Sequence, residues 1–73
     1  MPDIEVHSQI SGSIWKVLVG IGDAVAEDDP LVIIESMKME IPLLAPERGT
    51  VKEVRVTEGQ AVAEGDVIVI LER

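Results

Sequence analysis

The chain has 73 residues, a net charge of −8 and no cysteine. This length corresponds to one small domain, the charge opposes binding to nucleic acids, and the lack of cysteine excludes disulfides, thiolate metal sites and thiol nucleophiles. Apolar residues make up 47% of the chain, but Trp15 is its only aromatic residue. The core must therefore consist of valine, isoleucine, leucine and alanine, a composition that favours strands.

No targeting or membrane signal is visible in the sequence. Residues 1–3 lead directly into a strand pattern without a basic and apolar leader. The longest purely apolar run, residues 67–71, is too short to span a membrane. We therefore expect a cytoplasmic protein that binds neither nucleic acids nor membranes.

In chain order, alternating or continuous apolar stretches predict eight short strands separated by turns rich in glycine, proline and acidic residues. The first turn is predicted at residues 11–13. No window shows helical periodicity, and Pro30, Pro42 and Pro46 would interrupt a helix. The expected fold is an all-β, flattened eight-stranded barrel or sandwich, with strands at residues 3–9, 14–19, 24–26, 31–35, 39–44, 51–56, 61–63 and 67–72.

An internal repeat organises these strands. Residues 11–35 align with residues 48–72 at an offset of 37, with 12 identities in 25 positions. We interpret the chain as one domain, residues 1–73, made of two pseudo-symmetric four-strand halves at about 3–36 and 40–73. This arrangement predicts that both termini lie at one end and that Lys38 lies on a turn at the other end.

Comparison of the two copies shows where they differ. Gly65 aligns with Asp28, which predicts a position with positive φ that glycine adopts freely and aspartate tolerates. Ile14, Val17 and Val19 match valines in the second copy and form the expected inward set of their strand. The acidic run at residues 27–29 lacks the alternating oxygen ligands of a calcium loop and is interpreted as a solvated turn.

Three apolar residues of the first copy align with charged residues of the second. Trp15, Leu18 and Ile21 stand opposite a lysine, an arginine and a glutamate. One hypothesis is that they form an exposed patch for a partner or a second copy of the chain. The alternative is that they complete the core or are scattered singly.

The central hexad, residues 35–40, is the most informative stretch. Lys38 lies between Met37 and Met39, with Glu35 and Glu40 beyond them. A lysine on a hairpin tip is usually only a solvated charge. Two large apolar neighbours on an exposed turn, at the pole of a domain with little other chemical equipment, indicate a functional site instead.

The hexad, followed by Ala45-Pro46 and residues 49–51, resembles the biotinyl domain of biotin-dependent carboxylases. The resemblance covers about residues 3–72 and implies a barrel-sandwich hybrid in which Lys38 carries biotin in amide linkage. By the same resemblance, Met37 and Met39 are its neighbours in recognition and carboxylation, and Glu35 and Ser36 belong to the expected cofactor-binding site. The equal lengths of residues 19–30 and 56–67 leave no room for the thumb insertion of some bacterial carriers.

The resemblance implies a non-catalytic carrier subunit of a biotin-dependent, acyl-CoA-type carboxylase. Its partners would be a biotin protein ligase, a biotin carboxylase and a carboxyltransferase. Ser36 stands where biotinyl domains commonly have alanine, and Glu35-Ser36 also fits lipoyl domains, so lipoyl or dual attachment is one alternative. An unmodified β-domain that binds partners through Trp15 is another.

Overall fold

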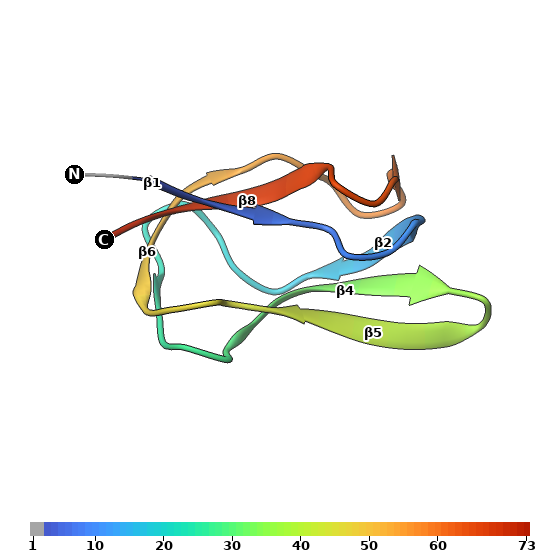
Figure 1. Ribbon diagram of the computed structural model, residues 1–73, viewed down its shortest axis with the longest axis horizontal. Coiled ribbons are helices and arrows are strands. Elements are labelled where there is room, and N and C mark those ends of the chain that lie inside the picture. Colours follow the sequence, from blue (N-terminus) through green and yellow to red (C-terminus); the bar gives the residue numbers. More distant parts are fainter. Residues whose placement is uncertain (1–2) are drawn as a thin grey trace.

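The computed structural model describes residues 3–73 as eight strands in two antiparallel sheets (Figure 1). The predicted all-β fold is confirmed, and the described residues contain no helix that could cross a membrane. The strands are β1 (Asp3–His7), β2 (Gly12–Val17), β3 (Ala24–Val25), β4 (Pro30–Ser36), β5 (Met39–Leu44), β6 (Gly49–Val54), β7 (Ala61–Val62) and β8 (Val67–Glu72).

Each sheet combines strands from both parts of the repeat. The order β1-β8-β6-β3 forms the sheet that we call the terminal sheet, and β5-β4-β2-β7 forms the hairpin sheet. The body measures 36 × 18 × 17 Å. Figure 1 shows the start of β1 and the end of β8 at one end of the long axis and the β4–β5 turn at the other, as the sequence predicts.

Backbone hydrogen bonds outside the regular ladders follow the same offset of 37. The amide of Gly22 donates to the carbonyl of Val51 at 2.8 Å, and the amide of Gly59 donates to the carbonyl of Ile14 at 2.7 Å. In each case a turn that follows a strand of one sheet is bonded to a strand of the other sheet. The two copies are therefore interlocked rather than placed side by side.

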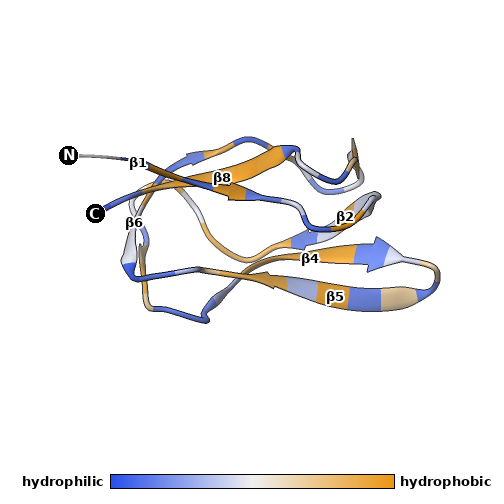
Figure 2. Cartoon of the chain, in the orientation of Figure 1, coloured by the Kyte–Doolittle hydropathy of each residue, from blue (hydrophilic) through white to orange (hydrophobic). Residues whose placement is uncertain are grey.

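The core lies between the sheets and is aliphatic. Figure 2 shows apolar residues concentrated along β4 and β8, with hydrophilic residues at the turns. Ile14 of the expected inward set is buried, and Val17 and Val19 are half-buried against the core. Five side chains are completely inaccessible to solvent: Leu31, Val32, Ile68, Val69 and Leu71.

The predicted turn at residues 11–13 is wrong, because Gly12 and Ser13 already belong to β2. A Cβ atom on Gly12 would collide with the carbonyl oxygen of Glu35 in β4. The glycine therefore permits a close approach of two strands, a use that resembles a turn signal in the sequence.

The acidic run at residues 27–29 is a turn that satisfies its own backbone. Asp29 Oδ2 accepts a hydrogen bond from the amide of Ala26 at 2.8 Å, and Asp66 does the same for Ala63 in the second copy. Asp28 has φ 71° and its counterpart Gly65 has φ 94°, which confirms the expected positive φ. Residues 3–73 contain no cluster of three or more side chains suited to hold a metal ion.

This turn generates the first prediction. Asp28→Gly removes an aspartate from a left-handed conformation and should raise the free energy of unfolding by about 0.5–1 kcal/mol. Asp29→Gly makes the same change in charge but removes the acceptor for the Ala26 amide, and should lower it by a similar amount. Urea denaturation of both variants measures the effect, and equal shifts in one direction would contradict the prediction.

Candidate functional site

The candidate site is the tip of the β4–β5 hairpin. The ladder pairs Ile34 with Ile41, Glu35 with Glu40, and Ser36 with Met39, which leaves Met37 and Lys38 as a two-residue turn. Ile34 is buried, so a shift of one residue would expose it and bury a glutamate. The core thus fixes which two residues form the tip.

Both turn residues adopt left-handed conformations. Met37 has φ 52° and Lys38 has φ 66°, the pattern of a type I′ turn. Such turns usually contain asparagine and glycine, because a side chain at positive φ costs about 1–2 kcal/mol. The β4–β5 ladder therefore holds a methionine and a lysine in a conformation that is unfavourable for both. Strained conformations of this kind concentrate at functional sites.

The tip is open to solvent. Met37 is 92% exposed and Met39 is 62% exposed, and Lys38 is exposed between them. Glu35 and Glu40 are exposed as a cross-strand pair one step below, and Ser36 is half-buried. The structure therefore brings the five predicted site residues together. Among residues 3–73, no ion pair within 4 Å joins Lys38 to a carboxylate.

The part of β4 next to the tip depends on Gly12, a residue for which the sequence predicts a turn and no place in the site. Ser13 pairs with Glu35, and Gly12 lies against the Glu35 carbonyl. Gly49 makes the corresponding approach to the carbonyl of Glu72 in the terminal sheet. The repeat of this glycine at an offset of 37 was the signal that could have identified it.

The three apolar residues singled out in the first copy do not all lie together. Trp15, Leu18 and Ile21 are 42%, 47% and 74% exposed, which excludes a place in the core. A bulge between Ile14 and Lys16 lies at Trp15 in the hairpin sheet, and Leu18 donates its amide to Leu31 of β4. Ile21 instead belongs to the loop whose Gly22 is bonded to β6 of the terminal sheet.

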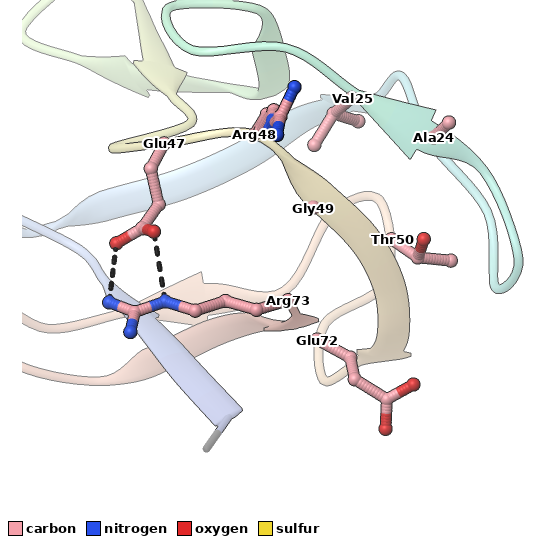
Figure 3. Close-up of a pocket in the computed structure, with 8 residues that line it drawn as sticks. All are labelled: Ala24, Val25, Glu47, Arg48, Gly49, Thr50, Glu72 and Arg73. Atoms are coloured by element: carbon pink, nitrogen blue, oxygen red, sulfur yellow. Dashed lines mark hydrogen bonds and ion pairs between the residues drawn. The ribbon is translucent and has the colours of Figure 1, made fainter. Parts of the chain in front are cut away.

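A pocket of about 450 Å³ lies at the opposite pole (Figure 3), beside the ends of β8 and β6. Arg73 and Glu47 form a two-pronged ion pair there, with both N···O distances 2.9 Å, and this pairing raises the pKa of Arg73. The lining residues are Ala24, Val25, Glu47, Arg48, Gly49, Thr50, Glu72 and Arg73. The pocket is thus separate from the exposed lysine at the hairpin tip.

The strained turn generates the second prediction. Met37→Asn places a residue that tolerates positive φ at a position where the methionine buries almost nothing, and should stabilise the fold by about 1 kcal/mol. Met39→Asn is the control, because Met39 lies in β5 and not in the left-handed turn. The midpoints of urea denaturation measure the change in stability. An equal increase for Met39→Asn and Met37→Asn would contradict the prediction.

Several known proteins share sequence with the chain, and three of them illustrate the similarity. A biotin/lipoyl attachment protein of Bacillus subtilis is 48% identical over 48 residues, which are 66% of this chain and 66% of that protein. A biotin carboxyl carrier protein of Streptococcus mutans is 55% identical over 55% of this chain and 31% of its own length. The biotinylated protein TB7.3 homolog of Mycobacterium leprae is 45% identical over 67% of this chain and 69% of that protein.

Solved structures also have the same fold over almost the whole chain, and two of them are described here. A single-chain, multi-domain long-chain acyl-CoA carboxylase matches 97% of this chain with a TM-score of 0.91 and 31% identity, over 7% of its own length. The urea carboxylase of Kluyveromyces lactis matches 99% with a TM-score of 0.93 and 29% identity, over 6% of its length. In both, the matched part is a small fraction of a large enzyme.

The family described as biotin-requiring enzyme matches residues 1–71, nearly the whole chain. The match includes the repeat, both sheets and the hairpin that carries Lys38. On this extent of agreement, the chain belongs to the biotin/lipoyl family.

Proposed function

We propose that this chain is a biotin carrier, with biotin attached in amide linkage to Lys38, and that it serves a biotin-dependent carboxylase. The observation that carries the proposal is Met37-Lys38-Met39 on a strained, exposed turn at the pole farthest from the chain ends, in a family of biotin-requiring enzymes. Two relatives support it by their names, a biotin carboxyl carrier protein and a biotinylated protein.

The attachment step requires an accessible amine. In the proposed reaction the ligase removes a proton from the Lys38 ammonium, the amine attacks the carbonyl carbon of a biotinyl adenylate, and AMP leaves. Lys38 is exposed, and no carboxylate of residues 3–73 lies within 4 Å of it. The amide product is neutral, so the tip keeps only the negative charges of Glu35 and Glu40.

The chain positions the cofactor and does not perform acid–base chemistry on it. Biotin supplies the ring nitrogen that carries CO2 between a biotin carboxylase site and a carboxyltransferase site. The hairpin holds Lys38 away from the body, and docking of the domain raises the effective concentration of the attached group at each site. Met37 and Met39, both largely exposed, are the residues nearest to Lys38 that a ligase or a carboxylase can contact.

The partners in this proposal are a biotin protein ligase, a biotin carboxylase and a carboxyltransferase. We place the carrier, together with these partners, in the cytoplasm. An acyl-CoA is the proposed acceptor, and the similarity to a long-chain acyl-CoA carboxylase supports it. Lipoate is a second candidate cofactor because one relative is named a biotin/lipoyl attachment protein, but the two methionines beside Lys38 favour biotin.

Intact-mass spectrometry of the protein from cells with active biotin and lipoate ligases tests the proposal. The wild type should gain the mass of one biotinyl group, and Lys38→Arg should gain none. Because Lys38 is exposed, Lys38→Arg should change the free energy of unfolding by less than about 0.5 kcal/mol. A mass increase equal to a lipoyl group would show that the cofactor is lipoate and not biotin. Biotin found on Lys16 or Lys52 in the variant would contradict the assignment of Lys38 as the attachment site.

Gly12, which lies against Glu35 near the hairpin tip, generates a further prediction. Gly12→Ala should destabilise the fold by about 1–3 kcal/mol and should also lower the rate at which ligase biotinylates Lys38, because the added methyl displaces Glu35. Gly49→Ala is the matched control, since its Cβ would meet the Glu72 carbonyl at 2.9 Å in the other sheet. A time course with radiolabelled biotin measures the biotinylation rate of each variant. Equal rates for Gly12→Ala and Gly49→Ala would contradict the prediction.

A further inference from the structure

The outer faces of the two sheets differ in polarity, and the internal repeat allows them to be compared position by position. On the hairpin sheet, five apolar side chains occupy positions on the face away from the core, and we call them the outer apolar patch: Trp15, Leu18, Ile33, Pro42 and Leu44. Four of them are exposed and Ile33 is half-buried. At an offset of 37 the terminal sheet carries polar or charged residues at four of these positions, Lys52, Arg55, Glu5 and His7, and an isoleucine, Ile70, opposite Ile33.

Strand register places these side chains on one surface. Pro42 pairs with Ile33, and Ile33 pairs with Lys16, which follows the bulge at Trp15. The neighbouring row lies on the opposite face: Ile14 and Ile34 are buried in the core, and Ile41, which pairs with Ile34, is half-buried. The bulge turns both Trp15 and Lys16 to the solvent, and the Lys16 ammonium lies 5.5 Å from the centroid of the indole ring. The patch thus crosses β5, β4 and β2.

The terminal sheet shows the equivalent backbone positions occupied by charged side chains. There Lys52 Nζ donates to Asp3 at 2.9 Å, which raises the pKa of Lys52, and Arg55 pairs with Glu53 at 3.2 Å. The same backbone positions therefore accept charged pairs without harm to the fold. Trp15, Leu18, Pro42 and Leu44 are therefore not required by the architecture, which indicates that they serve contact with another molecule.

The charges around the patch are mainly acidic. Glu35 and Glu40 border it toward the tip, and the turn with Asp28 and Asp29 precedes Pro30, which pairs with Leu44 at the other end. Glu58 lies beside β2 and accepts a hydrogen bond from the amide of Val17 at 3.3 Å. Two copies of a chain with charge −8 would repel each other across this acidic border, so a partner with a basic border is favoured over self-association.

We infer that the outer apolar patch is the surface by which this carrier docks on a biotin carboxylase subunit, at an apolar area bordered by lysine and arginine. The inference rests on the proposed function. ATP and bicarbonate are anions whatever the final acceptor is, so the entrance to a biotin carboxylase site attracts anions and complements Glu35 and Glu40. The same strands, β4 and β5, lead from the patch directly to Lys38.

The position of the patch separates this partner from the ligase. Pro42 lies four residues from Lys38 along β5, a rise of about 13 Å. A subunit that held the patch would leave the tip free to enter an active site. A ligase must instead act on the unmodified ε-amine itself and needs to grip the tip. The patch therefore suits the enzyme that repeatedly processes the attached group.

The test transfers residues of the terminal sheet to the hairpin sheet in the full chain. The variant Trp15→Lys/Leu18→Arg/Leu44→His carries the side chains found at the equivalent positions, so the fold should tolerate them. The control Glu5→Gln/Glu53→Gln makes the same change in net charge on the outer face of the terminal sheet. Both are biotinylated, checked by intact mass, and titrated as substrates in ATP hydrolysis by the biotin carboxylase subunit, which is also assayed with free biotin.

The expected result is a KM for the triple variant raised at least tenfold with kcat changed less than twofold, a control within twofold of wild type, and unaltered ligase kinetics. An unchanged KM, or equal increases in both variants, would overturn the inference while the biotin increment on Lys38 upholds the carrier role.

Two other outcomes would assign the patch to a different partner. Slower biotinylation of the triple variant alone would assign it to the ligase. A dimer formed by the wild type but not by the triple variant would assign it to self-association. Either would overturn the inference.

If the triple variant does not fold, Trp15→Ala alone serves in the same assay, with Lys52→Ala as its counterpart in the terminal sheet. A KM raised at least threefold for Trp15→Ala and unchanged for Lys52→Ala supports docking through the patch. Equal values for the two variants overturn it. A wild-type protein that acquires no biotin would refute the carrier proposal itself, and its mass spectrum reports that outcome before any titration.

Discussion

The register of the β4–β5 ladder is the constraint on which the functional end of this molecule depends. The buried side chains of Val32 and Ile34, opposite Leu43 and Ile41, hold the strands in one alignment because a one-residue slip would expose them. That alignment leaves two residues to close the hairpin, and they form a type I′ turn, in which both have positive φ. The conformation of Lys38 is thus determined by packing several residues away.

The strain in the turn and its exposure belong together. A turn of asparagine and glycine would satisfy the backbone but would offer neither an amine nor apolar contacts. Met37 and Lys38 supply these groups at a conformational cost that the aliphatic core offsets. Since no described residue ion-pairs with the ammonium, the lysine stays available to an external enzyme, and the rigid ladder below presents it in a reproducible position.

Much of the fold could be predicted because the sequence contains the same strand pattern twice. The repeat placed the strands within about two residues of their observed bounds and located Lys38 at the pole opposite the chain ends. The left-handed conformation of Met37 could not be predicted, since no glycine or asparagine marks it. Gly12 was misassigned because close strand approach and a turn favour the same residue. Only three-dimensional pairing separated Ile21 from Trp15 and joined Trp15 to Pro42 and Leu44.

The antiparallel pairing of β1 with β8 brings Asp3 opposite Glu72, at the pole away from Lys38. Residues paired in this way have Cα atoms about 5 Å apart, so a polypeptide can enter and leave the domain through almost the same point. Such a domain can be inserted into a longer chain, or circularly permuted near the same pole, without a linker crossing either sheet. The hairpin would then swing about a single pivot, and its sweep would be set by the linkers alone.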